Sequence, residues 1–458
     1  MQSQNKTKKS MTNPYKNRIA DIVLKEQLSC MGAVLIEGTK WCGKTTTAEH
    51  QAGSVLYMND PEQEVQNLQL AESQPSLLLE GATPRLIDEW QLAPRLWDAA
   101  RFAVDRRKVA GQFIFTGSAV PADTSRIHHS GAGRFAWVKM RTMSLYESED
   151  SNGSVSLEEL FNSGTPLAAV APKSDLQQMA TLICRGGWPG AIEKTERQAA
   201  KIPYNYLDAV CNTDISRVDG IKRDASFTRR LLRSYARHQG QQVSISTLLQ
   251  DLKNNEGSSL SEDTITSYIQ ALKKIFLIED MESWNPNLRS KTAIRTSDTR
   301  YFVDPSIAAA ALGLGAQDLM HDLETFGLLF ETLCVRDLRV YAEAIGGNVY
   351  HYRDKSGLEC DAVIHLNNGR YGLIEIKLGG ETLIEAGATT LKKLEQKLDT
   401  KKMGEPAFKM VLTAIGDYAF LRKDGIMIVP IRSLRTESRF SIIDCQSIRF
   451  IDFQIYRV

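Results

Sequence analysis

Residues 38–45, Gly38-Thr39-Lys40-Trp41-Cys42-Gly43-Lys44-Thr45, fit the pattern Gly-x-x-x-x-Gly-Lys-Ser/Thr in full. The apolar run Ala33–Glu37 before them is typical of a buried strand, and residues 45–50 can begin a helix. The backbone N–H groups of such a loop, together with the dipole of the following helix, surround phosphate oxygens. A chance match in a glycine-containing turn would not bring this context with it. The sequence therefore predicts a phosphate-binding loop.

The residues of this loop have separate expected roles. Lys44 is expected to neutralise charge on the β- and γ-phosphates of a nucleotide, and the hydroxyl of Thr45 is expected to bind Mg²⁺. We include the rest of the loop, from Gly38 to Gly43, and Thr46 at the start of the helix among the nucleotide-binding residues. ATP and Mg²⁺ are therefore the predicted cofactors.

Asp88 and Glu89 follow a short apolar stretch, Leu86-Ile87. An acid at the carboxyl end of a neighbouring strand is where a further magnesium ligand must lie, so we assign Asp88 to that role. Glu89 is then placed to polarise the attacking water. Asp-Glu pairs are also frequent on protein surfaces, but the phosphate-binding loop upstream favours the functional interpretation.

Two polar features follow the next apolar run. Thr116 or Ser118, at the end of Phe113-Ile114-Phe115-Thr116-Gly117-Ser118, is expected to sense the nucleotide from between the magnesium acid and the γ-phosphate. A plain turn at the end of a strand is the alternative. Arg134 is predicted to act across a subunit interface on the charge of the transition state, and a solvated arginine is the alternative there.

The first part of the chain has the pattern of a parallel α/β protein. Apolar runs alternate with helical patterns from about residue 15 to residue 147. The runs are residues 33–37, 55–58, 86–88, 113–116 and 137–140. We expect a disordered tail over residues 1–10 and a first domain over residues 11–170.

Residues 171–312 are predicted to form a mostly helical domain. Helical patterns over 229–238, 246–252 and 263–274 precede short apolar runs at 276–278, 283–284 and 301–303, and Ser261 is placed to cap the third helix. This order is typical of a winged helix, although helices packed for structural reasons alone give the same pattern. Basic residues gather nearby: Lys222, Arg223, Arg229, Arg230, Arg233 and Arg237. They suit either DNA phosphates or a solvated or subunit-contacting helix face.

Residues 313–458 are predicted to form a C-terminal α/β domain. A long helix over 323–344 precedes two alternating runs, 357–366 and 371–377, joined by the turn Asn367-Asn368-Gly369, which favours a hairpin. Asp361 lies in one strand, and Glu375 and Lys377 share one face of the other. The two carboxylates can hold Mg²⁺ while Lys377 orients water or steadies a phosphate, and Glu331 can add a further acid. An ordinary ion pair on a strand is the alternative.

These residues resemble the AAA+ superfamily of P-loop ATPases. More narrowly, they are similar to a bacterial and archaeal group that joins such a module to an uncharacterised C-terminal domain. The segments that carry this resemblance are 38–45, 86–91, 115–118, 133–134, 184–189 (Cys-Arg-Gly-Gly-Trp-Pro) and 326–377. The resemblance implies ATP hydrolysis in ring-like homo-oligomers such as hexamers.

The C-terminal pattern resembles a second superfamily. An Asp followed on the next strand by Glu-x-Lys is similar to the signature of restriction-endonuclease-like nucleases, matched here by Asp361, Glu375 and Lys377. The resemblance implies a nuclease fold, which either cleaves DNA or serves only to bind it.

The composition limits the class of protein. Lys and Arg number 56 against 55 Asp and Glu, so any nucleic-acid surface must be a local patch. We expect no membrane span and no secretory signal, and the 7 scattered cysteines indicate reduced thiols in the cytoplasm. We therefore expect an ATP-hydrolysing protein that acts on DNA, with Mg²⁺-dependent cleavage as a further option. The alternative is a regulatory nucleotide switch that binds a protein or DNA and carries a catalytically silent C-terminal domain.

Overall fold

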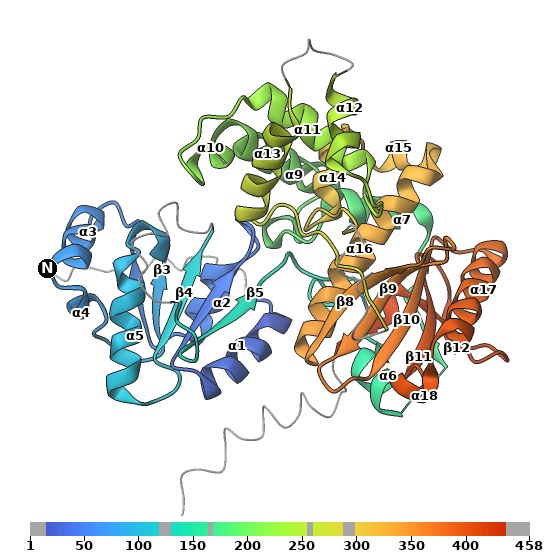
Figure 1. Cartoon of the computed structure of the whole chain (residues 1–458), viewed down its shortest axis with the longest axis horizontal. Coiled ribbons are helices and arrows are strands. Elements are labelled where there is room, and N and C mark those ends of the chain that lie inside the picture. Colours follow the sequence, from blue (N-terminus) through green and yellow to red (C-terminus); the bar gives the residue numbers. More distant parts are fainter. Residues whose placement is uncertain (1–14, 119–129, 164–167, 254–259, 287–297, 437–458) are drawn as a thin grey trace, which may run out of the picture.

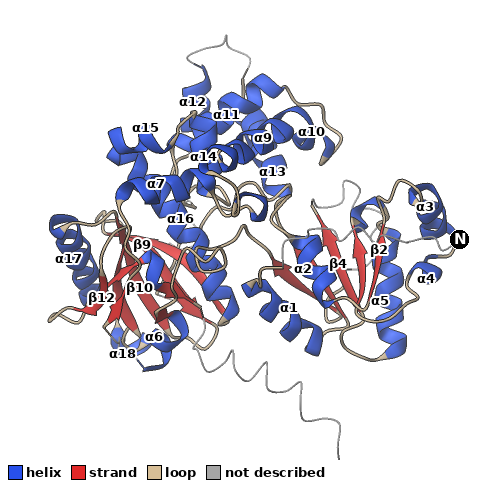
Figure 2. Ribbon diagram, turned by 180° about the vertical axis from the view of Figure 1, so that it is seen from behind, coloured by secondary structure: helices blue, strands red, loops and turns tan. Residues whose placement is uncertain are grey.

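The computed structural model describes residues 15–118, 130–163, 168–253, 260–286 and 298–436. The tail expected over residues 1–10, and the part of the expected C-terminal domain after residue 436, lie outside these residues. An N-terminal sheet and a C-terminal sheet lie side by side, and a helical region lies above both in the view of Figure 1. Figure 2 shows the same arrangement from behind. None of the helices in the described ranges is long and apolar enough to cross a membrane.

The N-terminal sheet is five-stranded and parallel, with the order β2-β3-β4-β1-β5. The predicted parallel α/β architecture is therefore confirmed for this part of the chain. Strand β4 lies between β1, which leads into the phosphate-binding loop, and β3, which ends at Asp88. The strands are β1 (Ala33–Glu37), β2 (Ser54–Tyr57), β3 (Arg85–Asp88), β4 (Phe113–Gly117) and β5 (Phe135–Lys139). The helices are α1 (Ile19–Cys30), α2 (Lys44–Gln51), α3 (Glu64–Ser73), α4 (Pro75–Leu78) and α5 (Arg95–Arg107).

Helices cover both faces of this sheet, which explains why β1 is apolar throughout. Val34 and Ile36 pack in one cluster with residues of α1 and α2. Ala33 and Leu35 point to the opposite face and pack in a second cluster with residues of α5. Strand β1 is thus fixed on both sides, and the loop after Glu37 leaves the sheet from a rigid base.

The helical region confirms the three predicted helices, which are α11 (Ala225–Arg237), α12 (Ile245–Lys253) and α13 (Glu262–Lys274). Ser261 caps α13 as predicted, because its hydroxyl accepts a hydrogen bond from the N–H of Thr264. Short antiparallel bridges follow, and they join Ile278 to Phe302 and Met281 to Thr299. The winged helix remains a prediction. The other helices are α7 (Leu176–Arg185), α8 (Glu196–Ala199), α9 (Lys201–Ala209), α10 (Ile215–Arg217), α14 (Pro305–Leu312) and α15 (Ala316–His321).

The C-terminal sheet is seven-stranded and mixed, with the order β7-β12-β13-β11-β10-β9-β8. The predicted long helix is α16 (Leu323–Ala344), and the predicted hairpin is confirmed by the antiparallel pair β9 and β10. Ile374 and Ile376 of β10 belong to the same core cluster as residues of α16, whereas Leu373 packs with residues of α17. The elements are β8 (Gly347–Arg353), β9 (Glu359–Leu366), β10 (Tyr371–Lys377), α17 (Glu381–Lys397), α18 (Thr400–Met403), β11 (Phe408–Thr413), β12 (Tyr418–Leu421) and β13 (Met427–Pro430).

The packing changes earlier in the chain than the expected boundary at residue 170. Strand β7 (Ala169–Val170) pairs with β12 at the edge of the C-terminal sheet. Strand β6 (Val155–Ser156) pairs with β14 (Leu434–Arg435), and α6 (Leu157–Ser163) places the ring of Phe161 5.0 Å from that of Phe408. Strands β6 and β7 and helix α6 therefore pack with the C-terminal region, because their partners come from distant parts of the sequence.

The expected boundary at residue 312 is also crossed. Ser283 bridges His351 in parallel, so the segment around it extends the C-terminal sheet beyond β8. The indole of Trp284 packs in the core between this sheet and α17, with its ring 5.2 Å from that of Tyr371. The helical region and the C-terminal sheet are thus joined by backbone pairing as well as by the chain.

A buried charge cluster joins the N-terminal sheet, the helical region and α16. Arg141, just after β5, forms ion pairs with Glu279 at 2.6 Å and with Glu343 of α16 at 2.7 Å. Burial alone would raise the pKa of Glu279, but the charge of Arg141, with smaller contributions from Arg339 and Lys139, holds this pKa well below its usual value. Removing one partner of such a pair leaves a buried charge uncompensated, so the cluster fixes how these parts meet.

Candidate active sites

The phosphate-binding loop has the conformation that its glycines were predicted to allow. Gly43 has φ 103° and immediately precedes α2, where a side chain would be strained. A Cβ atom added to Gly38, whose φ is 155°, would lie 2.0 Å from the carbonyl oxygen of Met140. Glycine is required at both positions for the loop to turn over the end of β1.

The ammonium group of Lys44 lies within the loop, where it can bind an anion. Its side chain is buried, and its ammonium group donates hydrogen bonds of 2.8 Å to the carbonyls of Gly38 and Thr39. The first turn of α2 contains no acidic residue. No negative side chain of that turn therefore offsets the positive end of the helix dipole, which faces the loop. These are the features that bind phosphate oxygens.

Asp88, at the end of β3, joins a residue of helix α2 to a residue of the neighbouring strand β4. Its Oδ1 accepts a hydrogen bond of 2.9 Å from the hydroxyl of Thr45. The same oxygen accepts a hydrogen bond from the hydroxyl of Thr116 at the end of β4. A hydroxyl and a carboxylate side by side are the donor set that holds Mg²⁺ in nucleotide sites of this layout, so Thr45 and Asp88 fit the ion.

Glu89 takes a backbone conformation that is unusual for its residue type. Its φ is 55°, in the left-handed region, and such strain is concentrated at functional sites. The amide of Gln91 donates a hydrogen bond to Oε2 of Glu89, and the hydroxyl of Ser118 donates to the same oxygen at 3.4 Å. Thr116 and Ser118, the two alternatives for a nucleotide sensor, thus contact Asp88 and Glu89 respectively. Thr46 lies exposed at the start of α2.

The helical region contacts the loop directly, which the sequence did not predict. The ammonium of Lys40 forms an ion pair of 2.6 Å with Asp214, and the hydroxyls of Thr39 and Tyr206 share a hydrogen bond. The ring of Trp41 lies 5.5 Å from that of Tyr206. The nucleotide site is therefore bounded by the N-terminal sheet on one side and by the helical region on the other.

The segment Arg185-Gly186-Gly187-Trp188-Pro189 supports this contact, and it was the signal that could have revealed it. The ring of Trp188 lies 4.8 Å from that of Tyr206. A Cβ atom added to Gly187 would lie 2.0 Å from the carbonyl oxygen of Met143, so glycine lets the chain approach the strand end closely. The motif positions Tyr206 over the phosphate-binding loop.

Arg18 is a further residue that sequence reasoning missed. Its buried guanidinium donates to the carbonyl of Cys42 at 2.7 Å and to that of Arg141 at 2.9 Å, and it forms an ion pair of 3.0 Å with Glu147. Arg18 therefore holds the loop in place by joining it to residues 141 and 147. A single arginine before a helix gives no local signal of such a role, because all its partners are distant in sequence.

Arg134 lies at the amino-terminal ends of the parallel strands, whereas the phosphate-binding loop of the same chain lies at their carboxyl ends. It precedes Phe135, which is in register with Ala33 at the start of β1, whereas the loop follows Glu37 at the other end. Five residues of strand span roughly 16 Å. Its half-exposed side chain forms an ion pair of 2.8 Å with Asp105. Arg134 is therefore not brought to the site within one chain, and any catalytic role requires a neighbouring copy.

The predicted carboxylates of the C-terminal sheet meet around a lysine. The ammonium of Lys377 lies 2.9 Å from Oδ2 of Asp361 and 2.8 Å from Oε2 of Glu375. The antiparallel ladder of β9 and β10 ends at Ala362 and Ile374, and beyond it the N–H of Ile376 donates to Asp361 at 2.7 Å. The strands separate at this point, which opens the hairpin around the carboxylates.

Of the acids of this site, Glu375 is buried, and Asp361 and Glu331 are partly buried. Burial raises the pKa of Glu375 to about 8, and the negative charge of Asp361 adds to the shift. Burial and the charge of Asp361 likewise raise the pKa of Glu331 on α16 to about 8. Burial alone would lower the pKa of Lys377, but the charges of Asp361 and Glu375 raise it. No group of three or more His, Cys, Asp or Glu side chains that could hold a metal ion forms in the described ranges, so Glu331 does not complete such a group here.

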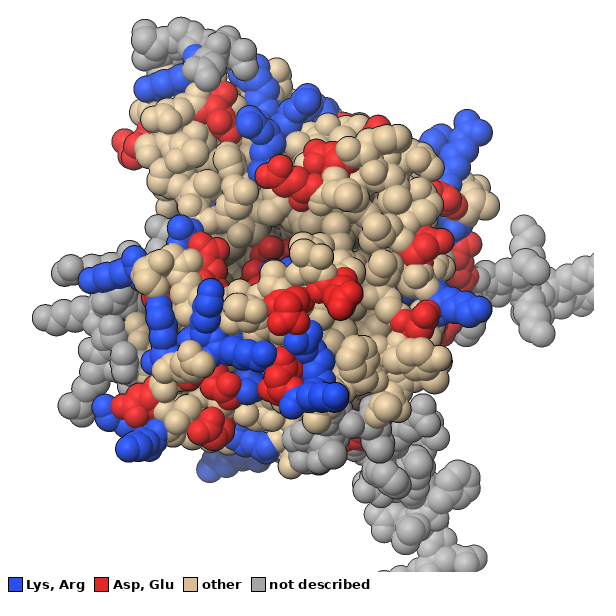
Figure 3. Space-filling view, turned by 90° about the vertical axis from the view of Figure 1, so that its right-hand side faces the viewer, with Lys and Arg blue, Asp and Glu red and all other residues tan. Residues whose placement is uncertain are grey.

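The basic residues of the helical region are largely engaged within the chain. Arg223 is buried and forms an ion pair with Asp219 at 2.7 Å, and Arg229 pairs with Asp208 at 2.5 Å. On the face shown in Figure 3, which includes α17, Lys and Arg side chains lie among Asp and Glu. On that face the basic side chains are interrupted by acidic ones.

Comparisons with known proteins address the separate parts of the chain. Residues 31–149 match a family described as an AAA domain. Residues 176–318 and 326–434 match the families described as domains of unknown function DUF8612 and DUF4143. A search of the curated proteins found no match.

Similar solved structures come from archaea. The Walker-type ATPase PABY2304 of Pyrococcus abyssi is 14% identical, with 64% of this chain and 94% of that chain covered and a TM-score of 0.38. A signal transduction ATPase with numerous domains and a tetratricopeptide repeat sensor, PH0952 of Pyrococcus horikoshii, is 13% identical, with 72% and 49% covered and a TM-score of 0.21. At these scores neither structure serves as a guide to function. The AAA match over residues 31–149 and the parallel sheet both support a P-loop ATPase in the N-terminal part of this chain.

Proposed function

We propose that this chain binds ATP with Mg²⁺ at residues 38–46 and hydrolyses it, and that it uses the hydrolysis to bind, remodel or translocate DNA. The observation that carries the ATPase part is the convergence of the hydroxyls of Thr45 and Thr116 on Asp88. The neighbouring parallel strands β3 and β4 supply Asp88 and Thr116 at their carboxyl ends, and the first turn of α2 supplies Thr45, which follows Lys44 in the chain.

Each side chain then has a chemical role. Lys44 turns from the carbonyls of the loop to the phosphate oxygens, and Glu89 accepts a proton from the attacking water. Gln91 and Ser118 hold the carboxylate of Glu89, and Thr116 lies where it can follow the state of the terminal phosphate. When bound by Thr45 and Asp88, Mg²⁺ neutralises charge that develops on the phosphates.

The DNA part of the proposal rests on the C-terminal region. The order α16-β8-β9-β10-α17-β11, with Asp361 on β9 and Glu375 and Lys377 on β10, is similar to the arrangement implied by the nuclease resemblance. The carboxylates lie where the hairpin opens. Mg²⁺-dependent cleavage of DNA at this site, with Asp361, Glu375 and Glu331 as metal ligands, is the finer form of the proposal.

We also propose that the chain works as a ring-like homo-oligomer such as a hexamer. The position of Arg134 supports this oligomer. Its half-exposed side chain lies at the amino-terminal ends of the strands, away from the phosphate-binding loop of its own chain. In a ring, it would reach the phosphates bound by the neighbouring copy.

A regulatory nucleotide switch is the second candidate function. The observation that favours it is the ammonium of Lys377, which already forms ion pairs with both Asp361 and Glu375. In this case the C-terminal region recognises a partner without cleaving it, and contacts such as Lys40 with Asp214 report the nucleotide state to the helical region.

An ATPase assay with single-stranded, duplex and branched DNA, run beside a mass measurement in solution, separates these functions. The proposed function predicts steady turnover that DNA stimulates, in an assembly larger than one chain. Tightly retained nucleotide with no stimulation by any DNA would favour the switch instead.

A further inference from the structure

Three consecutive residues of the phosphate-binding loop make its contact with the helical region. The ammonium of Lys40 forms an ion pair of 2.6 Å with Asp214, and the hydroxyls of Thr39 and Tyr206 share a hydrogen bond. Trp41, whose ring lies 5.5 Å from that of Tyr206, has a φ of 65°. Such strain at a residue other than glycine is concentrated at functional sites. Lys40 is also a second cation in a loop that binds anions, and no step of the proposed reaction uses it.

The two partners of the ion pair differ in their freedom to move. The side chain of Lys40 is 41% exposed, and that of Asp214 is 10% exposed. Exposed ion pairs contribute little to stability, and the flexible stem of a lysine lets its ammonium turn to another anion. Asp214 would then be a nearly buried carboxylate that has lost the cation paired with it, which is costly unless water reaches it. Departure of Lys40 therefore favours a movement of Asp214 away from the loop.

Lys40 lies on the side of the loop where the terminal phosphate of ATP is expected. Glu37, the last residue of β1, is in register with Gly117 of β4, which directly follows Thr116. The first residues of the loop therefore leave the sheet beside the hydroxyl that is proposed to follow the terminal phosphate. Lys44 lies at the other end of the loop, where α2 begins. Because the γ-phosphate distinguishes ATP from ADP, a cation on this side of the loop can distinguish the two nucleotides.

The helix that carries Asp214 is irregular at this contact. Tyr206 lies in α9, and the residues that continue this helix, Val210–Asp214, form a π-helix of 5 residues. π-helical turns are rare, and they are frequent at functional sites. Two residues of one continuous helical stretch thus hold the loop, and the π-helix sets the position of Asp214 relative to Tyr206.

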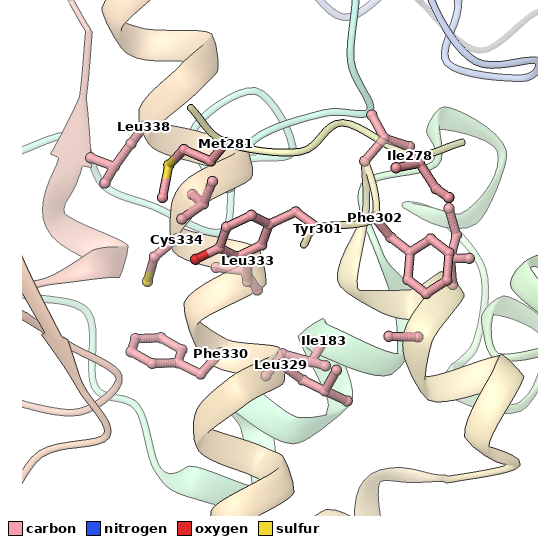
Figure 4. Packing of buried hydrophobic residues seen from close by; sticks show 14 of the residues in the cluster. Ile183, Ile278, Met281, Tyr301, Phe302, Leu329, Phe330, Leu333, Cys334 and Leu338 are labelled. Atoms are coloured by element: carbon pink, nitrogen blue, oxygen red, sulfur yellow. The ribbon is translucent and has the colours of Figure 1, made fainter. Parts of the chain in front are cut away.

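The helical region shares its core with the C-terminal part of the chain. Tyr206 belongs to the same core cluster as Leu329 of α16 and Ile374 of β10. Figure 4 shows Ile183 of α7 beside Leu329 within this cluster. The buried apolar residues of β1 belong to two other clusters. The polar contacts between the loop and the helical region can therefore change without opening an apolar core.

We infer that Lys40 is a second ligand of the γ-phosphate, which ATP draws away from Asp214 and which ADP leaves in place. Asp214 is then a positioning residue, since it competes with the γ-phosphate for the ammonium of Lys40. Binding of ATP releases the helix that carries Asp214 from the loop, and loss of the γ-phosphate restores the ion pair. The helical region thereby follows the nucleotide state. This inference rests on the proposed binding of ATP at residues 38–46, and it does not depend on the action on DNA.

The test compares the affinities of the full chain for two nucleotides in Mg²⁺ by calorimetry. The probes are ADP and adenylyl imidodiphosphate, an ATP analogue whose terminal phosphate is not released. Lys40→Ala should weaken binding of the analogue by about tenfold, as for a lost hydrogen bond between charged groups, and should leave ADP binding nearly unchanged. Lys40→Arg keeps the charge and should keep most of the preference for the analogue. Lys25→Ala, which removes an exposed lysine of α1, is the matched control and should behave as wild type.

Variants of Asp214 separate a positioning role from a structural one. Asp214→Asn removes the competing charge but keeps the size, so the analogue should bind about threefold more tightly, as expected for loss of an exposed ion pair, and ADP binding should change much less. Adding Asp214→Asn to Lys40→Ala should have no further effect, because Asp214 acts on the nucleotide through Lys40. Asp208→Asn, which removes an exposed carboxylate of α9 that pairs with Arg229, is the matched control. Thermal unfolding verifies that each variant is folded.

Amide hydrogen exchange measures the release of the helix itself. Residues 206–217 should exchange faster with the analogue bound than with ADP bound, because this stretch loses its contact with the loop. In Lys40→Ala the two nucleotides should give the same exchange, since the ion pair is absent in both states.

The possible failures are distinguishable. If wild type binds neither nucleotide, the proposed binding of ATP itself is wrong. If both nucleotides bind and Lys40→Ala weakens both equally or neither, Lys40 does not contact the γ-phosphate and only this inference falls. Weaker binding of the analogue by Asp214→Asn would mean that Asp214 supports the site instead of competing with it, and would also overturn the inference. Equal exchange of residues 206–217 with both nucleotides in wild type would contradict the release of the helix.

Discussion

The nucleotide site and the carboxylate site each place acids near a lysine, but the two lysines face different partners. Lys44 is bound by the neutral carbonyls of Gly38 and Thr39. Lys377 lies between the carboxylates of Asp361 and Glu375. A cation held by neutral dipoles can turn to an anionic ligand at little cost, whereas a cation between two carboxylates must move before a metal can bind there. The first site is arranged for phosphate, and the second is neutralised until a metal displaces its lysine.

The most severe test of this contrast removes the first lysine. Lys44→Ala should abolish ATP binding or turnover, because the β- and γ-phosphates lose their main cation. Phosphate release and nucleotide binding measure this effect. Lys25→Ala, which removes an exposed lysine of α1, is the matched control and should behave as wild type. Normal turnover in Lys44→Ala would show that the loop is not the nucleotide site.

The next largest effect concerns Arg134, whose role depends on a second copy. Arg134→Ala should slow turnover by about 10³ or more, as for other arginines that act in trans. Mixing Arg134→Ala with Lys44→Ala chains should restore part of the activity, because a mixed interface joins an intact loop to an intact arginine. If Arg134→Ala alone keeps normal turnover, Arg134 has no role in catalysis and its ion pair with Asp105 is structural.

Glu89 separates binding from chemistry at the nucleotide site. Glu89→Gln should keep ATP binding and slow hydrolysis by roughly 10² or more, because the general base is lost while the loop is intact. Steady-state phosphate release gives the rate, and calorimetry gives the affinity. Hydrolysis at the normal rate would mean that Asp88 and Glu89 are not the acid pair of this site.

The carboxylate site should depend on pH in a way that follows from its burial. Burial and the charge of Asp361 raise the pKa of Glu375 and of Glu331, so each carboxyl holds a proton to higher pH than usual and must lose it before it binds a metal. Mg²⁺ or Mn²⁺ affinity should therefore fall as the pH is lowered, by about tenfold for each pH unit over the range where one proton competes. Calorimetry of the full chain at several pH values measures this, with Asp361→Ala as the control. Affinity that is constant across this range would contradict the proposed ligands.

The smallest expected effect is that of the carboxylate site on ATP turnover. Asp361→Ala and Glu375→Ala should each abolish Mg²⁺-dependent nicking if the site cleaves DNA, or weaken DNA association if it only binds. ATP turnover should stay nearly intact, since the phosphate-binding loop lies in another sheet. If both variants keep normal metal binding and normal DNA affinity, Asp361, Glu375 and Lys377 form only an ordinary ion pair on a strand.

The difference between the sites also explains what the sequence could predict. The residues of the phosphate-binding loop are consecutive in the sequence. Strands β3 and β4 end at the acids and hydroxyls that meet the loop. The hydrophobic periodicity and one motif were therefore enough to predict this site. The hairpin of Asp361 and Glu375 was equally local, since the turn at Gly369 fixes it. In both cases each element of the site shows its pattern within one short stretch of chain.

What escaped prediction depends on residues far apart in sequence. Tyr206 and Asp214 meet the loop, and Gly240 and Tyr301 cover Glu331, only because the helical region packs against both sheets. The domain boundaries differ for the same reason, since β6 and β7 pair with β14 and β12 of the C-terminal region. Long-range pairing has no periodicity that reveals its partner.

The claim that the loop site is hydrolytic is tested most directly by a single turnover. Excess protein is mixed with labelled ATP and Mg²⁺, and the reaction is stopped with acid at increasing times. We predict that wild type converts all bound ATP to ADP and phosphate, and that EDTA prevents the conversion. Recovery of intact ATP from saturated wild-type protein would contradict this account and would leave a nucleotide switch.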